Sequence, residues 1–354
     1  MSQGRPVARL TTPAQMVASM PVWLGFVPTE SLVVMCCHEP RGRMGLTLRL
    51  DLPLAEHESL CLDDVERRVR QEKATRVVIG VYTDDPESFP RAEMIDDLRM
   101  RLSDLIITEA VLVRGGRFWS YLCQDPRCCP PEGTPVDTAV DEPPLMLLKA
   151  EQVLEGKTTL PDRSALEASL AGPSFLAAEA AKQRCAQAAT ALAKQVDSEG
   201  VGFACLLSIV DWNDVRERFV DPPGELTDDE AARLAVSIAE KLVRDVLATS
   251  DERDLPGLTL LLEELCRRTP APYDAPVCAL LGWILYGKGG GALLTILLER
   301  ALRSDPDHEL AQLLDQLLDA QTSPGRIREI TQEARDELRS SASRGGGARR
   351  RGRR

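Results

Sequence analysis

The sequence predicts a mixed α/β domain over residues 1–140, followed by an α-helical domain over 141–340. In the first part, apolar residues recur at every second position, which is the period of a strand with one buried face. In the second part they recur at every third or fourth position, as in an amphipathic helix. The stretch TPVDTAVDEPPL, rich in Pro and Asp, lies between the two patterns and indicates a linker.

The composition is that of a soluble protein with two hydrophobic cores. A chain of 354 residues exceeds what one ordinary core accommodates. Hydrophobic residues make up 44% and charged residues 28%, a globular balance. No apolar run approaches the roughly 20 residues that span a bilayer, and the N-terminus MSQGRPVARLTTPAQ has no signal-peptide core. These features favour a cytoplasmic location and no contact with membranes.

The first part is predicted to follow the order β-β-α-β-α-β-β. The expected strands cover 31–38, 45–53, 76–84, 107–114 and 117–123, and the expected helices cover 56–73 and 90–105. The run SLVVMCCH is typical of a buried strand, whereas GLTLRLDLP alternates strictly. Gly115 and Gly116 suit a tight hairpin turn. The helical crossovers favour parallel neighbours in the middle of the sheet, and the terminal hairpins make it mixed.

The second part is predicted to be a helical bundle with one repeat-like hairpin. Helices are expected at about 174–197, 203–219, 308–320 and 324–339, among others. Thr227 and Glu230 form a capping box that opens a further helix. The segment 277–306 indicates helix, glycine turn and helix, with Gly282, Ala301 and Pro306 at tetratricopeptide-repeat spacing.

Three cysteines, Cys123, Cys128 and Cys129, form the densest cluster of reactive side chains. A structural zinc site uses four thiolate or imidazole ligands. This cluster offers three, and adjacent cysteines seldom reach one ion together, so we predict no metal and no cofactor. A reactive thiol is a second interpretation, because nearby arginines would lower a thiol pKa. The favoured interpretation is a packed corner in which the thiols fill space beneath Trp119 or Tyr121.

Arg49 and Asp51 share the polar face of the alternating strand. A cross-strand ion pair is the favoured interpretation, and a polar floor to a ligand cleft is the alternative. The chain has three histidines: His38, His57 and His308. Ser31 lacks the G-x-S-x-G context of a nucleophile elbow, so a hydrolase triad is not expected.

Charge is distributed unevenly along the chain. The formal net charge is −12, yet six arginines and no acid lie between Arg344 and Arg354, and the remainder carries −12 minus 6, or −18. Such a body repels nucleic acid. The Ser, Gly and Arg composition predicts a disordered tail over 341–354. Contact with nucleic acid or an acidic partner is predicted only through the tail arginines Arg349, Arg350, Arg351, Arg353 and Arg354.

Four stretches together resemble a bacterial family of uncharacterised proteins, the domain-of-unknown-function family numbered 4192. They are VWLGFVPTESLVVM, GLTLRLDLP, WSYLCQDPRCCPPEG and GWILYGKGGGALLTILLERALRSDPDHELAQLL. The resemblance covers roughly residues 10–330 and implies a cytosolic bacterial protein with an α/β front and a helical back. The resemblance does not assign an activity or any catalytic residues to this chain.

Three functional hypotheses follow from the sequence. The favoured one is a non-enzymatic interaction or regulatory protein whose repeat-like hairpin presents a groove to a protein partner. The second is an enzyme of unknown reaction with a cleft between sheet and bundle, in which a thiol of the cysteine cluster acts with Arg49 and Asp51. The third is a protein that contacts nucleic acid through its tail.

Overall fold

A computed structural model describes residues 8–39, 42–123, 125–154, 158–220 and 224–350, with the side chains of 220 and 341–350 left out of the description. The chain divides into two compact units, Met1–Leu166 and Glu167–Arg354. This division lies after Leu166, whereas the sequence analysis placed the domain boundary near residue 140. The helix α4 (Pro143–Leu154) belongs to the first unit, because its Leu145 and Leu148 pack against Ala18 and Val22 of the N-terminal helix.

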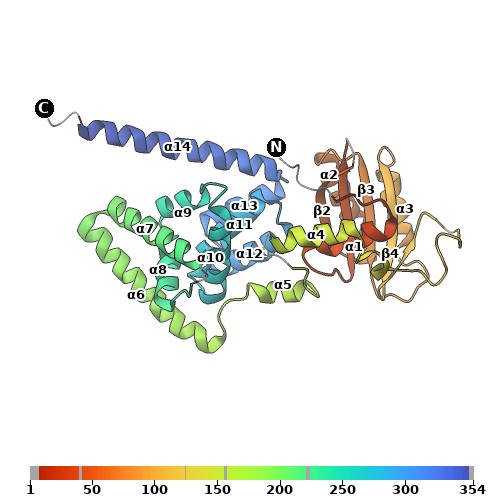
Figure 1. The fold of residues 1–354 in the computed structure, drawn as a ribbon, viewed down its shortest axis with the longest axis horizontal. Coiled ribbons are helices and arrows are strands. Elements are labelled where there is room, and N and C mark those ends of the chain that lie inside the picture. Colours follow the sequence, from red (N-terminus) through yellow and green to blue (C-terminus); the bar gives the residue numbers. More distant parts are fainter. Residues whose placement is uncertain (1–7, 40–41, 124, 155–157, 221–223, 351–354) are drawn as a thin grey trace. The chain divides into compact units, whose positions relative to one another are not determined.

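The first unit is built on a six-stranded mixed sheet in the order β2-β1-β3-β4-β5-β6. Figure 1 labels β2, β3 and β4 of this sheet. The strands are β1 (Ser31–His38), β2 (Arg43–Asp51), β3 (Arg76–Tyr82), β4 (Ile106–Arg114), β5 (Arg117–Ser120) and β6 (Thr134–Pro135). Only β3 and β4 pair in parallel, and the other neighbours are antiparallel. The predicted mixed sheet is confirmed, and the two-residue strand β6 is an addition to the predicted order.

Helices cover both faces of this sheet. The predicted helices α2 (Glu58–Gln71) and α3 (Ala92–Arg101) pack on one face. A helix that was not predicted, α1 (Pro13–Leu24), packs on the other. Strand β1 is consequently buried on both sides, which explains its uninterrupted apolar run. The start of α1 carries a capping box between Thr12 and Gln15 that escaped the sequence prediction.

The second unit is entirely helical among its described residues (Figure 1). The short α5 (Arg163–Ser169) spans the division, and the other helices are α6 (Phe175–Glu199), α7 (Val201–Val220), α8 (Asp228–Ser237), α9 (Lys241–Ala248), α10 (Leu255–Arg268), α11 (Asp274–Gly287), α12 (Gly291–Ser304), α13 (Glu309–Asp319) and α14 (Pro324–Arg350). None of the described helices has both the length and the apolarity that a bilayer crossing requires.

The predicted helical hairpin is formed by α11 and α12. Almost every side chain of α11 is buried, from Ala275 to Tyr286, so this helix forms the centre of its own unit. Gly282 allows the close approach, since a Cβ there would lie 3.3 Å from Leu294 and 3.4 Å from Leu314. The hairpin faces therefore pack internally, and its kinship with tetratricopeptide repeats stays a prediction.

The C-terminal helix α14 continues to Arg350, so the backbone is helical over the first part of the tail that was predicted to be disordered from residue 341. Extending a helix that has already formed fixes the backbone of only one further residue for each hydrogen bond that is added. The side chains of Arg349 and Arg350, and residues 351–354 with the other predicted tail arginines, lie outside the described part of the chain. Their contacts stay a prediction.

Candidate functional site

The three clustered cysteines converge in the loop that follows β5. The Sγ atoms of Cys123 and Cys128 are 3.2 Å apart, and all three Sγ atoms, that of Cys129 included, lie within 4.8 Å of one another. The backbone N–H groups of Cys128 and Cys129 both donate to the Asp125 carbonyl, at 3.1 and 2.7 Å. One tight turn therefore directs the two adjacent thiols to the same side.

The three thiols have different acidities. Hydrogen bonds from the Asp125 backbone, and then from Cys128 and Cys129, lower the pKa of Cys123. Burial and the neighbouring thiols raise the pKa of Cys129 to about 12. The bond to Cys123 raises the pKa of Cys128. Cys123 is thus the first thiol of the cluster to ionise.

The arginines near the cluster have other partners. Arg127 pairs with the Asp125 carboxylate at 2.6 Å, and Arg117 donates to the carbonyls of Glu132 and Gly133 at 2.7 and 2.8 Å. The expected source of thiol activation is therefore replaced by backbone hydrogen bonding. Cys128 is exposed, whereas Cys123 and Cys129 are half-buried, and the packed-corner interpretation stays a prediction.

Trp119 closes this loop from the other side. Its indole N–H donates to the Pro131 carbonyl at 2.9 Å, and the guanidinium of Arg114 lies 5.3 Å from the ring centroid. Gly133 lies against the ring, where a Cβ would come within 2.4 Å of it, and has φ +77°. The residue packed against Trp119 is thus Gly133, and this close packing is possible because glycine has no side chain.

Arg49 and Asp51 form an ion pair along a single strand. Their side chains meet at 2.6 Å on β2, where Arg49 is nearly buried and Asp51 is exposed. The Nε of Arg49 also donates to Ser31 Oγ at 2.8 Å, and that hydroxyl donates to the Thr29 carbonyl at 2.6 Å. Strands β1, β3 and β4 lie between β2 and β5, so this pair and the cysteine cluster are separate features.

The three histidines have local contacts. His38 Nε2 lies 2.9 Å from Glu72 Oε1. The ring of His308 caps α13 by accepting the Ala311 N–H at 3.3 Å. His57 is exposed at the start of α2.

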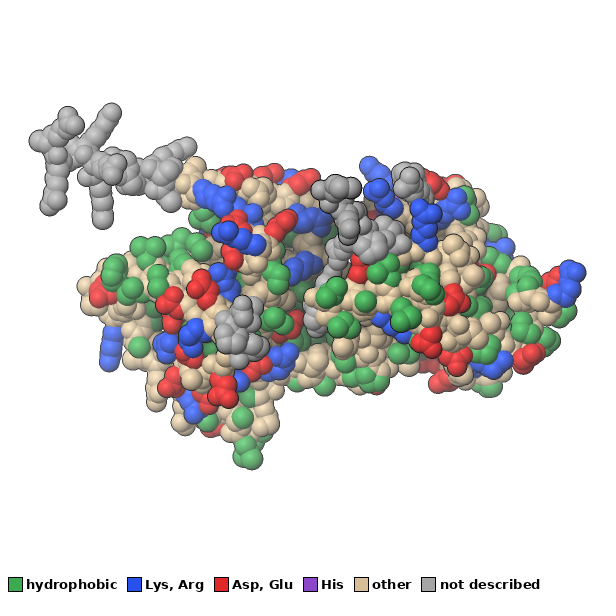
Figure 2. All heavy atoms as spheres, in the orientation of Figure 1, with side chains coloured by type: hydrophobic (Ala, Val, Ile, Leu, Met, Phe, Trp, Pro, Cys, Tyr) green, Lys and Arg blue, Asp and Glu red, His purple; other side chains and the backbone are tan. Residues whose placement is uncertain are grey.

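A further surface, which the sequence analysis missed, lies on α7. Four apolar side chains follow one another at the i, i+3, i+4, i+7 spacing of a helix face and are between 41% and 57% exposed: Phe203, Leu206, Leu207 and Val210. We call these four residues the α7 stripe. Figure 2 shows hydrophobic side chains gathered over the end of the helical unit that α6 and α7 form. The opposite face of α7 is buried in the core, with Trp212 donating to Ser237 Oγ at 3.0 Å.

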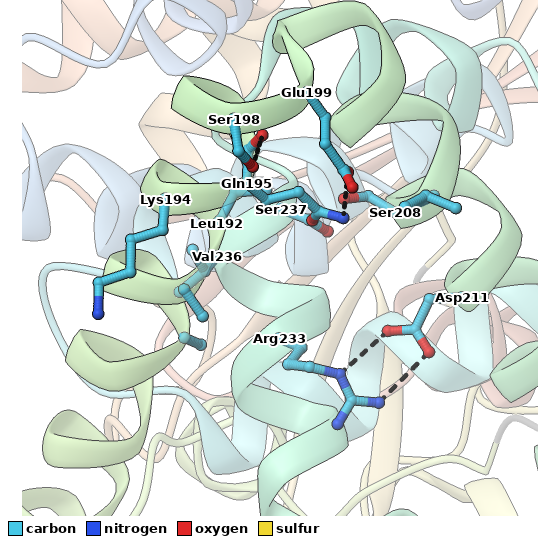
Figure 3. Close-up of a pocket in the computed structure, with 13 residues that line it drawn as sticks. Leu192, Lys194, Gln195, Ser198, Glu199, Ser208, Asp211, Arg233, Val236 and Ser237 are labelled. Carbon is cyan, nitrogen blue, oxygen red and sulfur yellow. Dashed lines mark hydrogen bonds and ion pairs between the residues drawn. The ribbon is translucent and has the colours of Figure 1, made fainter.

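A pocket of about 490 Å³ adjoins the α7 stripe. It lies between α6, α7 and α8 (Figure 3). Leu207 belongs both to its lining and to the α7 stripe. Asp211 and Arg233 close one side with two contacts at 3.3 Å, and Gln195 donates to Glu199 at 3.2 Å. The lining residues include no histidine or cysteine. The lining is mixed, because Ala188, Ala191, Leu192, Leu207 and Val236 alternate with polar and charged side chains.

Comparison with known proteins identifies the family. A family model described as a domain of unknown function (DUF4192) matches residues 13–325. This chain belongs to the DUF4192 family. Neither a curated protein nor a solved structure matches it in the same comparisons.

The DUF4192 match confirms the predicted resemblance and covers both compact units. The cysteine cluster, the α7 stripe and the adjoining pocket therefore all belong to the DUF4192 part of the chain. Most of α14 follows the matched region, which ends at residue 325.

The apolar residues of the α7 stripe are visible in the sequence, but their periodicity does not show that they are exposed. Apolar residues occur on both faces of α7, because Cys205, Trp212 and Val215 point inward while the stripe points outward. Such a helix looks fully buried from its sequence. Only the packing against α8 and α10 shows which face is covered.

Proposed function

We propose that this DUF4192 chain is a non-enzymatic interaction protein of the bacterial cytosol that binds an amphipathic helix of a partner protein along the α7 stripe. The observation that carries the proposal is the continuity of the stripe with the pocket between α6, α7 and α8. The ten cysteines, all present as free thiols, support a reducing compartment.

The dimensions of the α7 stripe suit a helix. From residue 203 to residue 210 the stripe rises about 10 Å at 1.5 Å per residue. A partner helix with its own i, i+3, i+4, i+7 stripe would interlock with it, in the helix-in-groove mode of recognition. The four half-exposed side chains leave on the order of 300–400 Å² of apolar surface, which is at the scale of functional patches on monomers.

The charges around the α7 stripe favour a basic partner. Asp214 and Glu217 continue the same helix face and are exposed, so two carboxylates follow the stripe, with Arg218 beside them. The whole chain carries a net charge of −12. A partner helix with Lys or Arg beyond its apolar face would complement these carboxylates and associate faster at low salt.

The same charges disfavour a second copy of this chain as the occupant. An antiparallel two-fold pairing centred between residues 206 and 207 would bring Asp214 of one copy toward Glu199 of the other. Both side chains are exposed carboxylates, and like charges opposite one another reduce affinity. A heterologous helix has no such conflict.

The test uses a photocrosslinking amino acid at position 206 in cells that produce the protein. Leu260, which is 45% exposed on α10, provides the matched control position. We expect a crosslink from 206 but not from 260, to a peptide that is amphipathic and basic. Binding of that purified partner should weaken about 30-fold in Leu206→Glu, since roughly 2 kcal/mol of apolar burial is lost, and should be unchanged in Leu260→Glu.

Two outcomes contradict the proposal. A crosslink from 206 to the same chain, together with a dimeric mass in light scattering, would assign the stripe to self-association. Equal crosslinking from 206 and 260, or equal affinity of the two glutamate variants, would show that the stripe is not a docking surface.

A further inference from the structure

We propose that Cys123, Cys128 and Cys129 form a binding site for a thiophilic metal ion of the zinc class. This inference is independent of the proposed helix docking, which concerns the other unit of the chain. It replaces the sequence prediction of no metal, which rested on the count of three ligands and on the expectation that adjacent cysteines seldom reach one ion together.

The spacing of the three Sγ atoms fits one ion. Zinc binds thiolates at about 2.3 Å, so two thiolates of a tetrahedral site lie roughly 3.8 Å apart. The Cys123–Cys128 separation is 3.2 Å and the largest separation within the cluster is at most 4.8 Å. Rotations about the side-chain bonds of this surface loop suffice to bring all three onto a common centre.

The loop backbone is organised independently of the thiols. The Asp125 carbonyl accepts from the N–H groups of Cys128 and Cys129, and the Asp125 carboxylate accepts from the Arg127 N–H at 3.0 Å. Trp119 fixes the exit of the loop through the Pro131 carbonyl. Little ordering entropy therefore opposes binding, which is the advantage of a preorganised site.

The ligand set selects the class of metal. Three thiolates without a carboxylate or carbonyl ligand suit soft or borderline ions such as Zn²⁺, and not Mg²⁺ or Ca²⁺. In the described part of the chain, no other His, Cys, Asp or Glu joins these three within ligand distance. The fourth tetrahedral position is then left to water or an exchangeable ligand, which distinguishes this site from closed four-cysteine structural sites.

The binding step is balanced by proton release. Three thiols lose their protons to solvent as three S–Zn bonds form, giving a centre with one net negative charge, and no electrons are transferred. Exposure of Cys128 provides the entry path for the ion.

The test titrates Co²⁺, as a spectroscopic probe for Zn²⁺, into the reduced full-length protein under nitrogen. We expect saturation at one equivalent, with sulfur-to-cobalt charge-transfer bands and the visible bands of tetrahedral cobalt, and displacement of cobalt by one equivalent of Zn²⁺. Cys128→Ser removes an exposed ligand and should weaken Co²⁺ binding more than the 10–100-fold typical of losing an outer-shell partner. Cys61→Ser, a half-buried thiol on α2, should leave binding unchanged.

Circular dichroism of each variant provides the check that the fold is retained. Co²⁺ spectra without charge-transfer bands would overturn the proposal. Spectra that are the same in Cys123→Ser, Cys128→Ser and Cys129→Ser as in the unaltered protein would overturn it as well.

Discussion

The buried ion pair of Asp274 and Arg300 provides the sharpest test of how the helical unit is held together. Asp274 on α11 is only 6% exposed and Arg300 on α12 is 16% exposed. Arg300 Nε donates to the carboxylate at 2.8 Å, and Ser304 Oγ donates to its other oxygen at 2.5 Å. Arg300 also donates to the carbonyls of Leu170 and Thr269, at 2.6 and 3.1 Å. One side chain thereby joins three segments.

The magnitude of Asp274→Ala follows from what the substitution leaves behind. Removing one partner of a buried pair costs about 3–5 kcal/mol, because the other charge stays buried. Arg300 retains two carbonyl acceptors and some solvent, so we expect the lower end, about 3 kcal/mol. With a urea m value of roughly 2 kcal/mol/M for a unit of this size, the unfolding midpoint should fall by about 1.5 M.

The assay is urea unfolding followed by the fluorescence of Trp212 and Trp283, which are both buried in the second unit. Replacing Trp23 and Trp119 with Phe confines the signal to that unit. The control is Arg326→Ala, which removes an exposed pair with Glu329 and should cost at most about 0.5 kcal/mol. A midpoint shift in Asp274→Ala no larger than that of the control would refute the reasoning.

Two further predictions concern a glycine and a carboxylate. Gly133→Ala should destabilise the first unit by about 2 kcal/mol or more in thermal unfolding, because the φ of +77° and the Trp119 ring, 2.4 Å from the position of a Cβ, both oppose a side chain. The control is Gly115→Ala, where φ is +54° and the space around the residue is open, so the substitution should cost only about 1 kcal/mol. Equal losses of stability in the two variants would contradict this account. Burial opposes ionisation of Glu230, but hydrogen bonds from Thr227 and an arginine prevail and lower its pKa to about 2. The folded pKa lies below the ordinary value of about 4.3, so this contribution is complete above that pH and is lost as pH falls toward 2. Urea midpoints measured from pH 5 to pH 2 should therefore fall less steeply in Glu230→Gln, and an unchanged slope would count against the assignment.

The sequence predicted the sheet well because its strands differ in period. Strand β1 is continuously apolar and β2 alternates, and each pattern matches the number of faces that the fold covers. Helix α1 was missed because Pro21 lies inside it and because its apolar residues do not form a clear stripe. The strand order was not predictable, since the pairing of β1 with β3 depends on contacts between segments far apart in sequence.

The candidate sites were predicted less completely than the fold. Sequence proximity identified Cys123, Cys128 and Cys129, but the convergence of adjacent thiols depends on a backbone turn at Asp125 that residue type alone does not determine. Arg49 and Asp51 were correctly placed on one strand face, although they pair along the strand and not across it. The α7 stripe became recognisable only when the packing of its opposite face was known.

The far edge of the sheet has a consequence for how this protein behaves when crowded. Strand β6 is two residues long and ends in Pro135, which has no amide hydrogen to donate to a strand of another chain. A strand from another chain would find few backbone groups to pair with at this edge, so fibril-like extension of the sheet from β6 is disfavoured. The opposite edge of the sheet differs, because it is formed by the nine-residue strand β2.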